Sequence, residues 1–381
     1  MTSSRTGAGR QRPVHFHVLK GSTAAVTIVA HAHPFVVGVD THARSHALTV
    51  LAAPHGEQID SAQFPATAAG IARAVDWASR RTGGDMTALW VIEGAGTYGA
   101  QLARLATRAG YPVVEAARMN ARSNRGVGKS DPLDARRIAE AVLPLRVAEL
   151  RHPRRDEGER AALQVLVAAR DHMTGERTAC VNALTALLRI VDLDIDARKP
   201  LTGMQITEVS HWRTRTEDLA TATARAEAIR LAKRTVALDK DLSANHNRLQ
   251  ALVRATPAAG LLDKAGVGPV TAAVAITAWS HPGRVRSEAA FACLAGVNPI
   301  PASSGNTTRH RLNRGGDRRL NRALHMATVT RMRMDPDTRA YTEKRRAEGR
   351  TTKEIRRCLK RYLARQIYRH LNAAHAPAST T

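Results

Sequence analysis

Residues 35–40 read Phe-Val-Val-Gly-Val-Asp, a short apolar run that ends in a carboxylate. Such a run predicts a strand that is buried on both faces. A carboxylate at the end of a buried strand is costly unless something holds it, so Asp40 is a candidate functional residue. The run at 88–92, Ala-Leu-Trp-Val-Ile, is similar and is followed by Glu93. Both acids are expected at the carboxyl ends of strands, where open α/β sheets place their sites.

The residues around these two strands predict the rest of an α/β domain over 35–150. Further strands are expected at 47–53, 61–64 and 112–115, and helices at 68–81 and 99–109. Three early strands followed by alternating helix and strand indicate a mixed sheet. Residues 1–34 are expected to be a loose extension ahead of this domain. The apolar stretch at 24–32 has histidine-rich flanks and precedes a strand, which argues against a signal peptide.

A second pair of acids follows in the segment Gly128-Lys129-Ser130-Asp131-Pro132-Leu133-Asp134. Pro132 is typical of a first helical residue after an Asp131 cap, so Asp131 and Asp134 should lie on one side of a helix start. Capping and dipole compensation alone would account for the pair, at about 1 kcal/mol. With Asp40 and Glu93 nearby, the four would form a set of hard oxygen ligands suited to Mg²⁺ or Mn²⁺. Two such ions could align a phosphodiester and a nucleophile.

Histidines contribute less to this prediction. His42 and His46 follow Asp40 closely, and we interpret them as incidental neighbours rather than ligands. No HExxH or similar spacing occurs among the sixteen histidines, so the sequence does not support a histidine zinc site.

Charge is large and unevenly distributed. The 381 residues carry a formal net charge of +25, which makes nucleic acid the leading partner. Residues 36–150 hold 13 basic and 11 acidic side chains, whereas residues 309–370 hold 20 and 6. This uneven charge favours catalysis by the front part of the chain, residues 36–150, and polyanion binding by the rear part, around residues 309–370. A run of charged residues can also be a solvated helix face.

Composition excludes several other classes of protein. Apolar residues make up 43%, which argues against disorder, and no apolar run is long enough to cross a membrane. Three cysteines, far apart in sequence, exclude a disulfide scaffold and fit a reducing cytosol, so a cytoplasmic location is expected. Aromatic residues make up only 3%, so backbone contacts should dominate over base stacking.

Residues 151–256 predict long helices with heptad spacing. With Leu163 as an a position, a and d positions are mostly apolar from Leu163 to Val191, apart from Arg170 and Arg177, and again from Leu231 to Leu252, where Asn245 occupies an a position. A polar a position can set the register of a coiled coil between chains. The alternative is a helical hairpin that packs within its own domain.

The third region, 257–372, is predicted to be mostly α-helical and is followed by a tail at 373–381. Gly266 and Gly268 form a turn between two helices that resembles a helix-hairpin-helix DNA-binding element, or a plain tight connection. A polar loop at 303–306 precedes a basic run. The arginines expected to hold phosphates are Arg309, Arg311, Arg314, Arg318, Arg319 and Arg322.

As a set, these motifs resemble the insertion-sequence 110 family of transposases. In the front part the similar stretches are residues 37–42 (VGVDTH), 91–99 (VIEGAGTYG) and 128–135 (GKSDPLDA). In the rear part they are 265–272 (AGVGPVTA), 291–299 (FACLAGVNP), 303–305 (SSG) and 312–324 (LNRGGDRRLNRAL). The resemblance covers about residues 36–370, with the motifs in the family's order.

This resemblance implies a mechanism. The front domain would be a RuvC-like DEDD domain with an RNase H-type fold, and Asp40, Glu93, Asp131 and Asp134 would be its metal-binding tetrad. The family's catalytic serine falls on Ser304, with Ser303 as the adjacent alternative, and would form a covalent phosphoserine intermediate with DNA. The resemblance also implies donor and target DNA as substrates and a structured guide RNA from the element.

Two other functions remain open at this point. A metal-dependent endonuclease of the Holliday-junction type would use the four carboxylates and water. A non-catalytic architectural protein would use the hairpin, the coiled coil and the basic tail, although unmasked carboxylates would repel DNA. Because strand exchange brings two duplexes together, we expect a homodimer or homotetramer.

Overall fold

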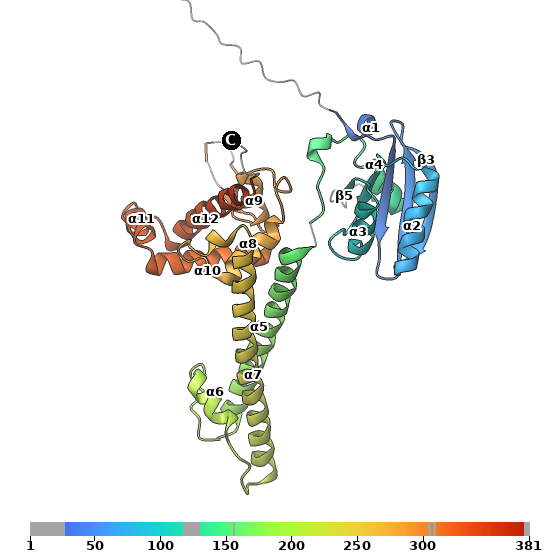
Figure 1. Cartoon of the computed structure of the whole chain (residues 1–381). Coiled ribbons are helices and arrows are strands. Elements are labelled where there is room, and N and C mark those ends of the chain that lie inside the picture. The colour runs from blue at the N-terminus through green and yellow to red at the C-terminus, as the bar shows by residue number, and fades with distance from the viewer. Residues whose placement is uncertain (1–26, 117–129, 155–156, 304–305, 308–309, 377–381) are drawn as a thin grey trace, which may run out of the picture. The chain divides into compact units, whose positions relative to one another are not determined.

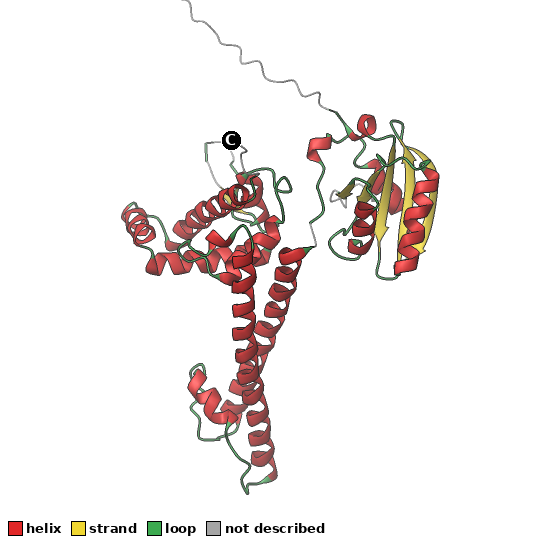
Figure 2. Ribbon diagram, in the orientation of Figure 1, coloured by secondary structure: helices red, strands yellow, loops and turns green. Residues whose placement is uncertain are grey.

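The computed structural model describes residues 27–116, 130–154, 157–303, 306–307 and 310–376. The chain divides into two compact units, Met1–Pro153 and Arg154–Thr381, which are described separately below (Figure 1). The first unit combines a sheet with helices, and the second is mostly helical (Figure 2).

The first unit is built on a five-stranded mixed sheet with strand order β3-β2-β1-β4-β5. Its elements are α1 (Val29–Ala32), β1 (Phe35–Thr41), β2 (Ser45–Ala52), β3 (Glu57–Pro65), α2 (Ala68–Arg81), β4 (Leu89–Ile92), α3 (Ala100–Arg108), β5 (Val113–Glu115), α4 (Asp131–Glu140) and η1 (Val147–Glu149). Strands β1, β2 and β3 pair antiparallel, whereas β1, β4 and β5 are parallel. The prediction of a mixed sheet is confirmed.

Two apolar cores cover the two faces of this sheet. Helices α2 and α3 pack on one face, against side chains such as Val37, Val39 and Trp90. Helix α4 packs on the other face, against Val36 and Leu89. Alternation along β1 explains this division, because successive side chains of a strand point to opposite faces.

Residues 27–34, which precede β1, are packed against the first unit and do not form the loose extension that was predicted. Val29 is fully buried in the core beneath α4, and its backbone N–H donates to the carbonyl of Leu145 at 2.9 Å. The expectation of a loose extension is therefore wrong for residues 27–34, because an apolar side chain there completes the core. Residues 1–26 lie outside the described part of the chain.

Gly38 lets α4 lie directly on β1. A Cβ atom at this position would lie 2.1 Å from the carbonyl oxygen of Ala135 and 2.8 Å from Cβ of Ala139. On the neighbouring strand, the fully buried Thr49 donates a hydrogen bond to the carbonyl of Pro132 at 3.3 Å. The small residue in β1 and the hydroxyl in β2 together place the first turn of α4 beside the end of β1.

A Gly38→Ala substitution should therefore displace α4 and destabilise the first unit by about 3 kcal/mol, the upper end of the usual cost of overpacking. Hydrogen exchange measured by mass spectrometry should show faster exchange in peptides from β1 and α4. Gly96→Ala is the matched control, because nothing lies within 4 Å of its added Cβ. Equal exchange in the two variants would contradict this account of α4.

The second unit begins with a long antiparallel helical hairpin, formed by α5 (Gly158–Ile190) and α7 (Leu219–Ala255), with α6 (Gly203–Ser210) packed on α7 (Figure 1). Asn245 of α7 donates to the carbonyl of Leu166 at 3.0 Å, and Arg234 pairs with Glu176 at 2.6 Å. The predicted a and d side chains thus pack within one chain. Asn245 contributes to the register of this hairpin, which was the alternative to pairing between chains.

The remaining elements of the second unit are η2 (Ala259–Leu261), α8 (Pro269–Trp279), α9 (Glu288–Leu294), α10 (Arg318–Met334), α11 (Pro336–Ala347) and α12 (Thr352–Ala374), and between α9 and α10 the strands β6 (Pro299–Pro301) and β7 (His310–Leu312) pair antiparallel. Helix α8 is apolar and buried, and α5, α7, α10 and α12 pack against it. The prediction of a mostly helical rear part is confirmed. Among the residues described, every helix is too short or too polar to cross a lipid bilayer.

Candidate metal centre and nucleic-acid interface

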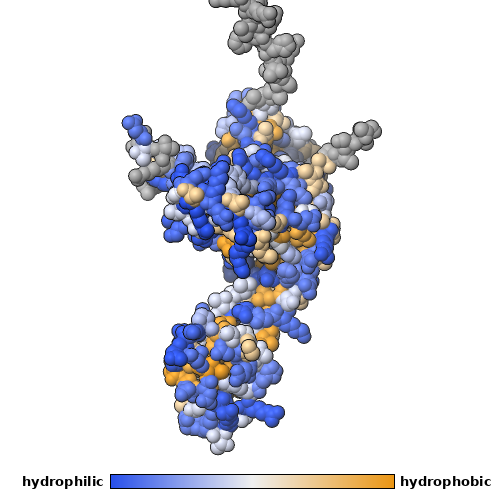
Figure 3. All heavy atoms as spheres, turned by 90° about the vertical axis from the view of Figure 1, so that its left-hand side faces the viewer, coloured by the Kyte–Doolittle hydropathy of each residue, from blue (hydrophilic) through white to orange (hydrophobic). Residues whose placement is uncertain are grey.

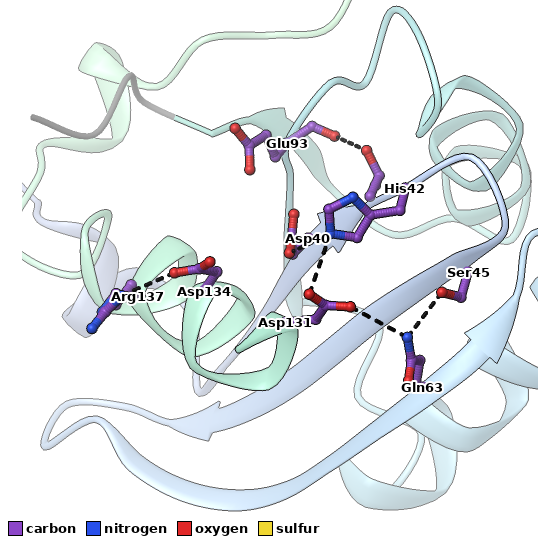
Figure 4. A network of polar contacts seen from close by, with 9 residues as sticks. Asp40, His42, Ser45, Gln63, Glu93, Asp131, Asp134 and Arg137 are labelled. Atoms are coloured by element: carbon purple, nitrogen blue, oxygen red, sulfur yellow. Dashed lines mark hydrogen bonds and ion pairs between the residues drawn. The ribbon is translucent and has the colours of Figure 1, made fainter. Parts of the chain in front are cut away.

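Asp40 and Glu93 come together because β1 and β4 are parallel neighbours. Val39 lies opposite Ile92 in the register, and the backbone N–H of Glu93 donates to the carbonyl of Val39 at 3.0 Å. Asp40 is the second-last residue of β1, and Glu93 directly follows β4. The two carboxylates therefore share one edge of the sheet, as the sequence predicted (Figure 4).

Helix α4 brings Asp131 and Asp134 to the same edge. The N-cap of this helix is Ser130, and Asp131 is its first residue, so the prediction of an Asp131 cap is wrong. Its carboxylate does not cap the helix but accepts a hydrogen bond from Nε2 of Gln63 on β3, at 3.4 Å. Asp134, one turn further along, is paired with Nη1 of Arg137 at 2.9 Å.

His42 connects two of the acids. Its Nε2 atom lies 3.1 Å from Oδ2 of Asp40 and 3.5 Å from Oδ1 of Asp131 (Figure 4). One ligand atom from each of these three residues lies within 4.8 Å of the others. The sequence led us to interpret His42 as an incidental neighbour, and the structure places it in contact with both carboxylates. Its position two residues after a strand-terminal aspartate was the available signal for this contact, and a role as a metal ligand stays a proposal. His46 instead is buried on β2.

Electrostatics at this edge oppose the accumulation of charge. Burial raises the pKa of Asp40, and His42 lowers it in part, whereas Asp131 and Asp134 raise it further. Burial also raises the pKa of Glu93, and the neighbouring charges of Asp40 and Asp134 add to this shift. Among the described residues, Asp40 and Asp131 bring ligand atoms together with His42, whereas Glu93 and Asp134 lie outside this group and Asp134 is paired with Arg137. Neighbouring carboxylates that raise the pKa of Asp40 form an environment that a divalent cation stabilises.

The serine loop lies between β6 and β7 in the second unit. Ser303 is exposed just after β6, whereas Ser304 and Arg309 lie outside the described residues. The base of this hairpin is held by Asn313, whose Nδ2 donates to the carbonyl of Cys293 at 3.0 Å and to Oδ1 of Asn298 at 2.8 Å.

A second contact beneath the hairpin of β6 and β7 explains the glycine at position 316, within the stretch 312–324. A Cβ at Gly316 would lie 2.3 Å from the backbone nitrogen of Gly296, so these backbones pack directly. Asn321 of α10 donates to the carbonyl of Ala295 at 2.8 Å and accepts from Lys360 of α12 at 3.0 Å. Sequence reasoning did not single out this asparagine and lysine pair, because residues distant in sequence form it.

The predicted phosphate-binding arginines fall into two groups. Arg319 and Arg322, on α10, form ion pairs with Asp171 of α5, the first at 2.6 Å. Their part in binding phosphate would require release from this carboxylate. Arg311, Arg314 and Arg318 are exposed, and for them phosphate binding stays a prediction.

The two predicted glycines of the rear turn also differ. Gly266 has φ +72°, and an added Cβ would lie 2.5 Å from the carbonyl oxygen of Ala327, so α10 packs against this turn. Gly268 precedes α8, and a Cβ atom added there would meet no atom within 4 Å. Close helix packing therefore accounts for Gly266, whereas backbone approach to a phosphate stays a prediction for Gly268.

Comparison with known proteins gives the class. Residues 37–191 match the family model of the DEDD transposases of IS110, and residues 259–343 match the model described as the transposase IS116/IS110/IS902 family. Both describe transposases, which cleave DNA and transfer it. The chain belongs to the IS110 family of insertion-sequence transposases.

Two relatives agree with this family. One is the insertion element IS900 uncharacterized 42 kDa protein of Mycobacterium paratuberculosis, 26% identical over 308 residues that cover 68% of this chain and 76% of that protein. The other is the insertion element IS110 uncharacterized 43.6 kDa protein of Streptomyces coelicolor, 32% identical over 123 residues. That alignment covers 32% of this chain and 30% of that protein.

Proposed function

We propose that this transposase cleaves and rejoins DNA through a serine nucleophile assisted by a metal-binding, RuvC-like domain of RNase H type. The observation that carries the proposal is the meeting of Asp40 and Glu93 at one sheet edge, with Asp131 joined to Asp40 through His42. The mixed sheet, with α4 on the face opposite α2 and α3, supports the RuvC-like assignment.

The residues at this edge fit a divalent cation. Asp40, Glu93, Asp131 and Asp134 supply hard oxygen donors, and Asp40 is largely buried with a raised pKa. Mg²⁺ or Mn²⁺ held there would neutralise charge that develops on a phosphate during cleavage. Arg137 would keep Asp134 in place, and Gln63 would orient the second oxygen of Asp131.

The covalent step would be carried by Ser304, or by the neighbouring Ser303. The serine oxygen would form a bond to the phosphorus, the bond from phosphorus to one strand oxygen would break, and that oxygen would leave as a hydroxyl once protonated. The serine proton would pass to a nearby base, because an unassisted hydroxyl is a poor nucleophile. Attack by a DNA hydroxyl on the phosphoserine would rejoin the strand without ATP.

The test is to trap this adduct. The full chain, incubated with DNA from the ends of its element and with Mg²⁺, should yield a covalent protein–DNA species, and peptide mapping should place the phosphate on Ser303 or Ser304. Cleavage without any adduct would favour the endonuclease alternative, in which water attacks. DNA binding without cleavage would favour the architectural alternative.

Partners beyond DNA are also proposals. The resemblance and the excess of arginine support a structured guide RNA that reads sequence by base pairing, so the protein itself needs few base contacts. Strand exchange between two duplexes supports a homodimer or homotetramer. A coiled coil between chains would have to use surfaces of the hairpin other than its own α5–α7 seam.

We further propose that His42 is a ligand or a positioning residue of the metal centre. A His42→Ala variant should bind Mn²⁺ about tenfold more weakly, in the range found when groups that support metal ligands are removed. Spin resonance distinguishes the two roles, because a ligand gives coupling of Mn²⁺ to nitrogen in the original protein only, whereas a positioning residue gives none in either protein. His55→Ala, an exposed histidine of the same unit, is the matched control. Unchanged Mn²⁺ affinity in His42→Ala would exclude this role.

A further inference from the structure

A basic pocket lies between α10, α11 and the start of α12, apart from the serine loop and from the predicted phosphate-binding arginines. Its volume is about 390 Å³, and four arginines contribute to its lining: Arg333, Arg339, Arg346 and Arg356. They come from all three helices, so the pocket exists only in the folded arrangement. The face of the second unit seen in Figure 3 is largely hydrophilic over its upper part, with few apolar side chains.

Within the described part of the chain, these four arginines form no ion pair with an acid. Glu343 is the acidic residue in the lining, and it forms no ion pair with any of the four within the described part of the chain. Other arginines of α11 and α12 behave differently, because Arg345 of α11 pairs with Glu348 and Arg369, near the far end of α12, pairs with Glu288. The pocket therefore concentrates unpaired positive charge, whereas neighbouring surfaces balance theirs.

The spacing of the arginines suits an extended polyanion. Arg339 and Arg346 are seven residues apart on α11, which places them on one face about 10 Å apart along the helix. One strand of double-stranded DNA advances by about 3.4 Å per nucleotide. The two turns of α11 between Arg339 and Arg346 therefore span about three nucleotide steps along the axis of the duplex, and Arg333 and Arg356 lie on the flanking helices.

We propose that this pocket binds the sugar–phosphate backbone of double-stranded DNA, at a distance along the duplex from the cleaved bond. The inference rests on the proposed function, because a transposase must hold DNA beyond the bond it cuts. No aromatic ring lines the pocket, and its apolar side chains are Val329 and Met332. Single-stranded RNA, which is recognised largely by base stacking, is therefore the poorer fit.

The experiment measures DNA binding by the full chain as a function of salt, with a labelled duplex of about 30 base pairs. The triple variant R339Q/R346Q/R356Q should reduce the slope of log affinity against log salt by about 2.7, and should weaken binding at 0.1 M salt about 100-fold. The control is R345Q/R350Q/R369Q, which removes the same charge from arginines that are already ion-paired. Its slope should change by less than 1.

Each other outcome has a defined meaning. An equal loss of DNA affinity in both triple variants would show diffuse electrostatic attraction and overturn the pocket assignment. An unchanged salt slope in R339Q/R346Q/R356Q would also overturn it. A loss confined to RNA of the same length would overturn the assignment to DNA. Both variants should keep the melting temperature and Mn²⁺ affinity of the original protein. Failure of that original protein to bind DNA would contradict the proposed function itself, whereas normal binding with an unaffected triple variant would contradict only this inference.

Discussion

An Asp40→Asn variant is expected to lose metal-dependent DNA cleavage by about 1,000-fold or more while it retains DNA binding. Asp40 is the most buried of the four acids, and it lies beside Asp131 and Glu93 in space. The amide of asparagine replaces a negatively charged oxygen donor with a neutral one, and metal ions typically contribute several kcal/mol to the stabilisation of such a transition state. Single-turnover cleavage and a parallel binding titration would measure the two effects.

Asp60→Asn is the matched control for this variant. Asp60 lies on β3 in the same unit, and its carboxylate pairs with Arg81 at 2.6 Å rather than with the acidic edge. Cleavage should be nearly unchanged in this control. Normal cleavage by Asp40→Asn would remove the basis for a metal centre at this edge of the sheet.

The Asp40→Asn variant should also differ from the original protein in stability when no metal is bound. Because burial raises the pKa of Asp40 above 3.8, the folded chain holds this proton to a higher pH than the unfolded chain does. The stability associated with that proton is present below pH 3.8 and is lost as the pH rises through the folded-state value. The asparagine cannot titrate, so the midpoint of unfolding should favour the variant more at pH 7 than at pH 3. A difference that does not depend on pH would contradict this account.

A variant that carries both Ser303→Ala and Ser304→Ala is expected to form no covalent protein–DNA adduct and to lose strand exchange. The double variant removes both serine hydroxyls of this loop, so the loss should exceed about 1,000-fold, as when an essential nucleophile is removed. Gel shifts under denaturing conditions would detect the adduct, and recombination of a reporter plasmid would measure exchange. Each single variant then identifies the attacking serine.

Asn306→Ala is the control for the serine variants, because Asn306 is an exposed residue of the same loop without a nucleophilic oxygen. Its adduct should form normally. Undiminished strand exchange by the double serine variant would refute the serine mechanism and leave cleavage to water at the acidic edge.

Much of the first unit could be predicted from local patterns. The apolar runs at 35–39 and 88–92 indicated strands β1 and β4, and the parallel pairing of such strands was enough to bring Asp40 and Glu93 to one edge. The cap of α4 could not be predicted reliably, since Ser130 and Asp131 are both good N-cap residues. The choice of Ser130 as the N-cap accompanies the packing of α4 on the sheet, where Gly38 allows the close approach of this helix.

Ion pairs and pockets formed by residues distant in sequence could not be predicted from the sequence. Nothing near Arg319 or Arg322 in sequence indicates that Asp171, about 150 residues earlier, would bind them both. Asn245 was recognised as a polar residue in an apolar seam, but its partner, the carbonyl of Leu166, depends on how two helices turn back on each other. Such contacts join residues that are distant in sequence, so periodicity carries no information about them.

The sequence by itself determined the family, the mixed sheet, the long helices and the four acidic candidates, because motif order, hydrophobic period and charge are local properties. Only the tertiary structure decided that His42 joins Asp40 to Asp131, and that four arginines of α10, α11 and α12 line one pocket. These arrangements depend on the packing of separate elements, and packing brings together side chains whose spacing along the chain has no regular pattern.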